Sequence, residues 1–218
     1  MIFEDYFLRM INQLANVLAS VLGLMKVRRY DEAVEGVEAS SKQLLGMDLR
    51  FLTSLTDSEF VRLLSLGDRF DVEKCVVVAE LLRIVGDIRQ QQGRERDGSR
   101  CHATALSLFL ELLRHEAGIL PQEYCEKIEK LAESLPSAEL SADVRKKLFL
   151  YYESVGRFEK AENLLFGIVE QDVSFMDDGL RFYGRLRMRS DEELERGNLP
   201  RNEIESSVMT LTKLAKKE

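Results

Sequence analysis

The sequence predicts an all-α protein made of stacked antiparallel helical hairpins. Apolar residues recur at the three- and four-residue spacing of a helix face through most of the 218-residue chain. The only β-branched run, Val76–Val78, lies inside one of these helical patterns, and the chain has three prolines and no tryptophan. Because no linker or low-complexity segment interrupts the pattern, we expect a single domain over residues 1–218 that buries its own core.

The first predicted helix, Phe3–Lys26, carries a wide apolar face. Two adjacent apolar seams run along it, and Ala15, Ala19 and Gly23 form a ridge of small residues that another backbone can approach closely. Either this face packs against its own chain, or part of it forms a homodimer. The candidate dimer face consists of Phe3, Phe7, Met10, Leu14, Ala15, Ala19 and Gly23.

Caps and chain breakers place the remaining helices. Thr56 with Glu59 and Ser190 with Glu193 both have the spacing of a capping box, and Ser141 is expected to cap a further helix. The expected segments are Tyr30–Leu45, Thr56–Leu66, Val72–Gln92, Cys101–Glu116, Pro121–Pro136, two helices flanking a turn at Val155–Phe158, and helices that begin near Asp177, Ser190 and Pro200.

The predicted helix Val72–Gln92 is apolar on two nearly opposite sides. Cys75 and Leu82 belong to one side, and Val77 and Leu81 belong to the other. Such a helix is flanked by neighbours on both sides, as in the middle of a helical stack. We therefore expect its narrow polar strip to face a groove or water.

The segment Lys146–Gln171 predicts a complete helical hairpin. Gly156 stands where the first helix must stop, in a position that suits the left-handed backbone conformation. From there Gly-Arg-Phe-Glu-Lys-Ala resembles the turn of a tetratricopeptide repeat, Gly-x-Tyr/Phe-x-x-Ala. Val27–Ala33 is similar, with Arg28 in the glycine position, and Gly93–Ser99 resembles a third, lengthened copy that we expect to form a flexible loop.

Taken whole, the chain resembles an uncharacterised family of bacterial all-helical proteins with a tetratricopeptide-like fold. The residues that carry this resemblance are Asp5–Ala15, Leu22–Leu24 and Leu199–Arg201. The resemblance implies a right-handed α–α superhelix, in which the first helix of each hairpin lines the concave side. It carries over no activity, cofactor or catalytic residue.

Composition narrows the function classes. A net charge of −7 opposes general affinity for nucleic acid, because phosphates attract basic surfaces. Three widely spaced cysteines without a CxxC pair indicate a reducing compartment. The acidic start of the chain differs from a signal peptide, and the uncharged stretch Met10–Met25 falls short of the about 20 apolar residues of a membrane span. We expect a cytoplasmic protein that binds neither nucleic acid nor membranes.

Residues with catalytic or metal-binding chemistry form no recognisable set. Cys101-His102 is the only adjacent Cys/His pair, but neighbouring side chains on a helix diverge by about 100° and no third residue orients them. His102 and His115 lack the spacing of metal ligands, and phosphate-binding glycine motifs are absent. We therefore expect no cofactor, no metal and no catalysis. Four arginines of one segment either bind an anionic partner or face solvent: Arg181, Arg185, Arg187 and Arg189.

The favoured hypothesis is a non-catalytic helical-repeat protein that binds another protein or a peptide. Mixed charge with one apolar anchor, Leu150, suits a peptide better than a nucleic acid, unless these side chains merely face water. Two alternatives stay open: a regulatory sensor that holds a small molecule or short signalling peptide between the hairpins, and an enzyme that uses Cys101 or an acidic pair. The expected groove residues are Glu80, Arg83, Asp87, Gln90, Asp143, Lys146, Leu150 and Glu153.

Overall fold

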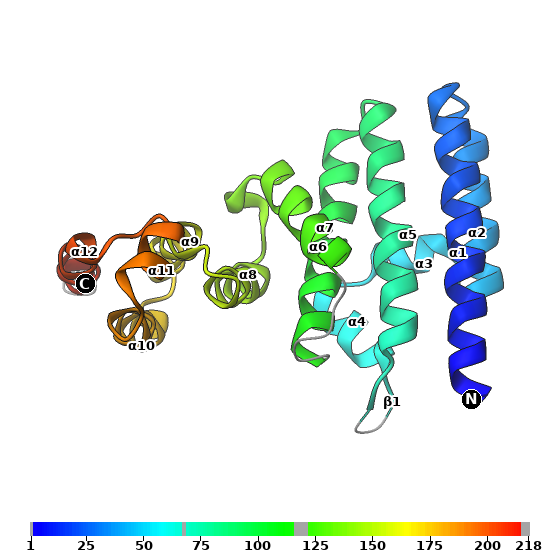
Figure 1. Cartoon of the computed structure of the whole chain (residues 1–218). Helices are drawn as coiled ribbons and strands as arrows, with labels where there is room; N and C mark the ends of the chain where they lie inside the picture. The colour runs from blue at the N-terminus through cyan, green and yellow to red at the C-terminus, as the bar shows by residue number, and fades with distance from the viewer. Residues whose placement is uncertain (1, 67–68, 116–121, 215–218) are drawn as a thin grey trace. The chain divides into compact units, whose positions relative to one another are not determined.

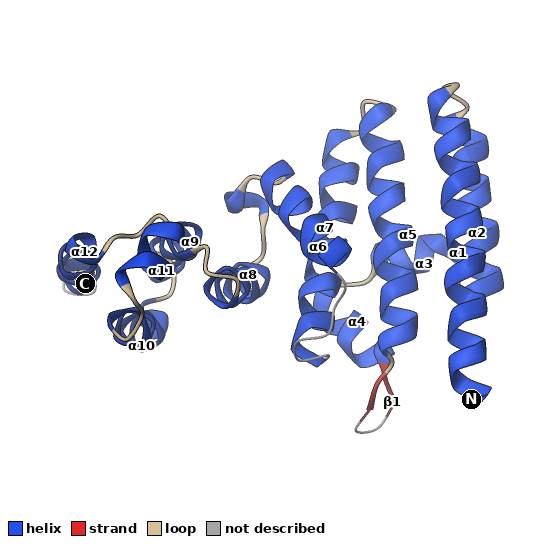
Figure 2. Ribbon diagram, in the orientation of Figure 1, coloured by secondary structure: helices blue, strands red, loops and turns tan. Residues whose placement is uncertain are grey.

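The computed structural model describes the backbone of residues 2–66, 69–115 and 122–214, and side chains from residue 10 onward within these ranges except at 57, 66, 69, 122 and 138. The chain forms two compact units, Met1–Pro136 and Ser137–Glu218. Both units are built from helices (Figure 2), so the predicted all-α class is confirmed. The prediction of one domain over the whole chain stays a prediction.

The first unit contains two long helical hairpins and several shorter helices (Figure 1). Its helices are α1 (Ile2–Lys26), α2 (Tyr30–Leu45), α3 (Leu49–Ser54), α4 (Asp57–Leu64), α5 (Val72–Gln91), α6 (Glu95–His115) and α7 (Gln122–Ser134). Between α4 and α5, the two-residue strands β1 (Ser65–Leu66) and β2 (Arg69–Phe70) pair antiparallel. α1 packs along α2 and α5 packs along α6, while α2 lies next to α5. The first unit is therefore a stack of hairpins.

The second unit repeats this organisation with shorter helices. Its elements are the 3-10 turn η1 (Ser137–Glu139), α8 (Ala142–Ser154), α9 (Phe158–Val169), the 3-10 turn η2 (Val173–Phe175), α10 (Met176–Arg187), α11 (Asp191–Arg196) and α12 (Arg201–Leu214). α8 pairs with α9, and α10 packs against α12. In Figure 1, α10 lies on the lower side of this unit.

Local signals set most helix ends where the sequence predicts them. α2 has the predicted bounds, because Gly46 ends it in the left-handed conformation with φ 67°. The Glu59 carboxylate accepts the Thr56 N–H at 2.8 Å, and Ser190 Oγ accepts the Glu193 N–H at 3.3 Å. Both predicted capping boxes are thus confirmed. The short helix α3 was not predicted; the Asp48 side chain caps it by accepting the Arg50 N–H at 2.9 Å.

Four turns in the described part of the chain share one geometry. Each contains a residue with positive φ: Arg28 (60°), Gly93 (75°), Gly156 (74°) and Asn198 (58°). The N–H of that residue donates to the carbonyl three positions back at 2.9–3.2 Å, and the next N–H donates to the carbonyl five positions back at 2.8–3.0 Å. The Gly93 turn has the same hydrogen-bond spacing as the other three, so the expectation of a lengthened copy was wrong.

The predicted flexible loop Gly93–Ser99 is mostly helix. α6 begins at Glu95, six residues before the predicted start at Cys101. Gly98 lies inside the first turns of α6, where a Cβ would stand 3.0 Å from the Gly86 carbonyl oxygen of α5. The glycine is therefore required by the close packing of α5 on α6, and its presence does not indicate a loop.

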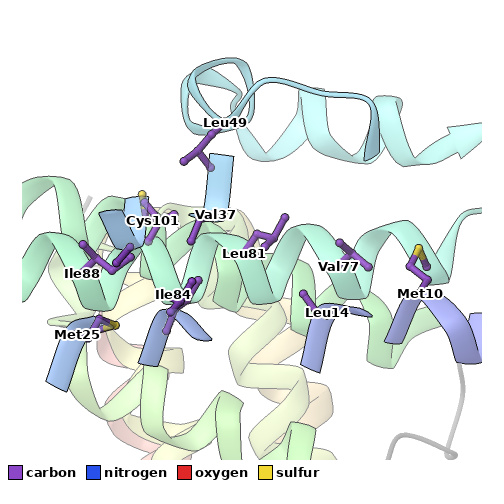
Figure 3. Close-up of a cluster of buried hydrophobic side chains, with 13 residues drawn as sticks. Met10, Leu14, Met25, Val37, Leu49, Val77, Leu81, Ile84, Ile88 and Cys101 are labelled. Carbon is purple, nitrogen blue, oxygen red and sulfur yellow. The ribbon is translucent and has the colours of Figure 1, made fainter. Parts of the chain in front are cut away.

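Apolar side chains of α1, α2, α5 and α6 form the core of the first unit (Figure 3). Val77 and Leu81 of α5 face α1 and α2 and are 0% exposed, and Cys75 on the other side of α5 is also 0% exposed. The predicted two-sided burial of this helix is confirmed. Met10 and Leu14 of α1 are 4% and 3% exposed and lie in the same core, so these two residues of the candidate dimer face are occupied within their own chain.

Aromatic rings and one close backbone approach hold the second unit together. The Phe149 ring of α8 meets the Phe182 ring of α10 edge-on, with centroids 5.3 Å apart. Gly197, before α12, lies so close to the α8–α9 turn that a Cβ would stand 2.3 Å from the Phe158 ring and 2.7 Å from the Gly156 carbonyl oxygen. Two helix pairs distant in sequence therefore meet through their turns.

Candidate functional site

The polar strip of α5 is a continuous row of charged contacts. Glu80 accepts the Nε–H of Arg83 at 3.0 Å, and Arg83 donates through Nη1 to Asp87 at 3.0 Å. The other Asp87 oxygen lies 2.9 Å from Nε2 of His102 on α6, and Lys127 of α7 donates to the other Glu80 oxygen. The row therefore joins three helices of the first unit.

Exposure rises along this strip from Glu80 toward Gln90. The side chain of Glu80 is 3% exposed, that of Arg83 22% and that of Asp87 33%, and Gln90 is exposed. Of the four predicted groove residues in this unit, Glu80 is therefore an internal ion-pair residue, while the other three reach the surface. Burial, together with the Glu80 charge, also raises the pKa of nearby Tyr124 to about 12.

Two glycines set the position of the polar side chains at the exposed end of the strip. A Cβ on Gly86 would stand 2.1 Å from Cδ2 of His102, and a Cβ on Gly98 would stand 2.6 Å from Cγ of Gln90. The His102 ring therefore lies directly over Gly86, where it reaches Asp87, and the Gln90 stem lies against α6. Packing thus holds the Asp87 side chain through His102 and holds the aliphatic stem of Gln90.

A shallow hollow of about 350 Å³, open to solvent, lies at this end between α1 and α5. α1 contributes an apolar wall, with Leu22 44% and Met25 6% exposed. α5 contributes a polar wall of one carboxylate and two amides, from Asp87, Gln90 and Gln91. The hollow thus combines apolar contact with hydrogen-bonding groups, as small-molecule sites do.

The second unit carries the other predicted groove residues on the outer face of α8. Lys146 Nζ lies 2.8 Å from the Asp172 carboxylate, and this hydrogen bond holds the pKa of Asp172 below its usual range. Glu153 accepts two bonds from the guanidinium of Arg185 on α10, at 2.5 and 2.8 Å. The α8 face is therefore tied to α10 by a bidentate ion pair.

Leu150 lies between these two ion pairs along α8 and is 56% exposed. The fourth predicted residue, Asp143, pairs at 2.7 Å with Lys147. All four predicted residues of this unit thus lie on one ordered helix face, and its single large apolar side chain is Leu150. We call the face formed by Asp143, Lys146, Leu150, Glu153 and Arg185 the α8 face.

The arginine run of α10 is neutralised within its own unit. Arg181 and Arg189 pair with acids of the same or the next helix, Asp178 and Glu193, at 3.2 Å each. Arg187 pairs with Glu205 of α12 at 2.8 Å, and Arg185 pairs with Glu153 as described. The run therefore presents carboxylate-paired guanidinium groups rather than a basic patch.

Cys101 and His102 point to different partners. Arg89 donates to Cys101 Sγ at 2.9 Å, whereas His102 contacts Asp87. Burial raises the pKa of the Cys101 thiol, and the nearby Arg89 and Arg100 only partly oppose this. An activated nucleophile needs the opposite shift. The arrangement of this pair thus supplies no nucleophile–base geometry.

The small-residue ridge of α1 faces outward. Ala15, Ala19 and Gly23 are exposed, and a Cβ on Gly23 would meet no atom within 4 Å. The side chains of Phe3 and Phe7 lie outside the described residues. The homodimer stays a prediction, and it rests on the ridge instead of on the seam of Met10 and Leu14.

Sequence reasoning missed the residues that complete each site from another element. Lys127 and Asp172 lie 47 and 26 positions from their partners Glu80 and Lys146, so no local spacing indicates them. Leu22 belongs to an apolar seam of the first helix, and its exposure at a hollow depends on the position of α5. The charge of Arg185 is evident from the sequence, but nothing there pairs it with Glu153.

Comparison with known proteins places the chain in a family without assigning chemistry. A protein-family model described as "Family of unknown function (DUF6483)" matches residues 1–216. Searches of curated proteins and of solved structures gave no match. Within the described residues, none of the helices combines the length and apolar character that crossing a membrane requires.

Proposed function

The chain belongs to this family of unknown function, and from the geometry of its helices we propose that it is a non-catalytic helical-repeat protein that binds a peptide segment of another protein. The proposal includes a tetratricopeptide-like right-handed superhelix. The four turns of one geometry support that arrangement, since they join the two helices on either side of each turn alike, as the turns of a repeat do. A cytoplasmic location stays part of the proposal, on the odd number of three widely spaced cysteines.

The observation that carries the proposal is the α8 face. A leucine that is 56% exposed stands between two ion pairs that hold their side chains in place. A bound peptide that covers Leu150 gains apolar burial, while Lys146 and Glu153 offer one group of each charge for its polar side chains. Mixed charge around an apolar anchor fits a peptide chain, which carries both kinds of group.

The expected contribution of Leu150 to peptide affinity follows from the exposed fraction of its side chain. Covering about half of a leucine side chain contributes about 1 kcal/mol, or about fivefold in affinity. Replacing Leu150 by alanine should weaken a bound peptide by about that factor. Leu150→Asp should weaken it by at least about 30-fold, because an unpaired carboxylate would be covered by the ligand.

The test is selection of 12-residue peptides from a display library on the intact protein, followed by affinity measurement. Selected peptides should lose affinity for Leu150→Asp and keep it for Met209→Asp, a matched change at an α12 side chain that is 59% exposed. Absence of any enriched peptide would contradict the function. Equal affinity for wild type and Leu150→Asp would remove the α8 face as the site.

A second function, that of a regulatory sensor for a small molecule, is supported by a different observation. The hollow of about 350 Å³ lies between two hairpins and has one apolar and one hydrogen-bonding wall. A ligand there would contact both hairpins, so its binding would favour one spacing of α1 and α5. Both functions can belong to one protein, since the two sites lie in different units.

A further inference from the structure

We propose that the hollow between α1 and α5 binds a small uncharged molecule that carries a carboxamide-like N–H and C=O edge next to an apolar ring or chain. This inference rests on the sensor function and names its class of ligand. It draws on the volume of the hollow, the hydrogen-bonding capacity of its polar wall and the charge balance behind that wall.

The size and shape suit a compact ligand. A volume of about 350 Å³ lies at the lower end of the range of roughly 300–1,000 Å³ that is typical of small-molecule sites. Leu22, at 44% exposure, offers most of the apolar surface, and on one side only, because Met25 is held in the core at 6% exposure. A ligand with a single apolar portion and a polar edge on the opposite side therefore fits the two walls.

The polar wall offers acceptors and donors in a defined pattern. Each Asp87 oxygen already accepts one bond, from Arg83 or from His102, and each keeps capacity for a second. Asp87 therefore calls for an N–H donor on the ligand. Gln90 and Gln91 supply both an N–H and a C=O, and neither amide has a partner among the described side chains. A carboxamide has two N–H donors and one acceptor, which complements this set.

The charge balance favours an uncharged ligand. Arg83 compensates Asp87 at 3.0 Å, and the Arg83 neighbour Glu80 is compensated by Lys127 as well. A carboxylate in the hollow would meet the Asp87 charge without a cation to offset it, and an ammonium group would compete with Arg83 for an anion already paired. A neutral edge forms its hydrogen bonds without adding a charge beside the paired Asp87 carboxylate.

Packing holds the recognition groups in place. The His102 ring is 4% exposed and lies over Gly86, which fixes the direction of Asp87. The Gln90 stem rests against Gly98. A ligand therefore loses little affinity to ordering these two side chains.

The test uses three probes of one shape and different charge: benzamide, benzoate and benzylammonium. Binding is followed on the intact protein by two-dimensional amide NMR, with assignments for α1 and α5. Benzamide should shift resonances around Leu22 and Gln90 with an affinity on the order of millimolar, as its small number of atoms implies. Gln90→Ala should weaken it about fivefold, the effect of one hydrogen bond, and Gln43→Ala on the exposed side of α2 should leave it unchanged.

Each contrary outcome has a distinct meaning. Tighter binding of benzoate or benzylammonium at the same residues would overturn the uncharged class and leave the sensor function standing. Absence of shifts around the hollow with all three probes would overturn the ligand class and remove the hollow as a sensor site. Equal benzamide affinity for wild type and Gln90→Ala would overturn the proposed hydrogen bonding of the carboxamide edge by Gln90. Circular dichroism checks that Gln90→Ala, which shortens an exposed side chain whose stem rests against Gly98, keeps the helical fold.

Discussion

Replacing Lys127 by methionine removes one of the two cations that neutralise the Glu80 carboxylate. That side chain is 3% exposed, and its contacts are Lys127 from α7 and Arg83 on its own helix. Arg83 remains in the variant, so Glu80 keeps one partner and loses the other. A charged hydrogen bond lost at a buried group costs about 1.5–3 kcal/mol, and breaking a buried pair altogether costs about 3–5 kcal/mol. We expect a loss of about 2–3 kcal/mol.

The measurement must report on the first unit alone, because the chain forms two compact units and a single melting curve mixes them. Native-state hydrogen exchange of α5 and α7 amides meets this need. A loss of about 2–3 kcal/mol corresponds to opening that is about 30- to 150-fold more frequent. The matched control is Lys74→Met on α5 of the same unit, at a pair with Asp71 whose side chains are 40% and 22% exposed. A half-exposed pair contributes less than about 1 kcal/mol.

A double variant distinguishes the cost of removing the whole Glu80–Lys127 pair from the cost of leaving the buried Glu80 carboxylate without Lys127. Glu80→Met with Lys127→Met removes both groups and leaves Arg83 paired with Asp87 at 3.0 Å. Apolar replacement of a whole buried pair is often neutral or stabilising, so the double variant should recover most of the stability lost in Lys127→Met. The reasoning is refuted if Lys127→Met costs less than Lys74→Met, or if the double variant is less stable than the single one.

Three further predictions concern the same structure. Gly86→Ala places a Cβ 2.1 Å from the His102 ring and should destabilise the first unit by about 1–3 kcal/mol. Gly167→Ala, whose added Cβ would meet no atom within 4 Å outside its own helix backbone, should instead stabilise α9 by up to about 1 kcal/mol. Native-state hydrogen exchange of α5 and of α9 measures each effect in its own unit, and equal effects would contradict the packing argument. Tyr124, with its pKa raised to about 12, should stay protonated above pH 10, so its contribution to stability is present below pH 10 and is lost as the pH rises toward 12. Ultraviolet titration against Tyr124→Phe checks this, and a difference spectrum centred near pH 10 would oppose it. Ala19→Glu should convert a homodimer into a monomer in light scattering, whereas a wild-type mass of about 25 kDa, that of one chain, at micromolar concentration would rule out an obligate dimer through the α1 ridge.

Helix boundaries were predictable wherever a signal and its effect lie within one or two turns of each other. Gly46 ends α2 at the predicted residue, and Ser190 caps α11 through an N–H only three positions away. The Gly93 segment shows the limit of such signals. Glycine with many charges predicts a loop, yet Gly98 is inside a helix because α5 passes too close for a side chain. The residue type was visible in the sequence, and the neighbour that requires it was not.

The sequence predicted which candidate residues share a helix face. It did not predict which of them are buried or which residues of other helices they contact. Periodicity placed Arg83, Asp87 and Gln90 on one strip of α5, and it placed Lys146, Leu150 and Glu153 on one face of α8. It did not distinguish buried Glu80 from exposed Gln90, because both lie on the polar side of an otherwise apolar helix. That difference depends on α7, which brings Lys127 over one end of the strip and leaves the other end open beside α1.

By itself the sequence determined the helical class, most helix ends and the turns that reverse the chain, since hydrogen bonds between near neighbours and the spacing of apolar residues are local properties. Only the tertiary structure decided that Glu80 pairs with a lysine 47 positions away, that Glu153 pairs with an arginine 32 positions away, and that Leu22 stands across a hollow from Asp87. Periodicity tells which face of a helix is covered but carries no information on what covers it, because burial is non-directional and the partner is chosen by the packing of the whole unit.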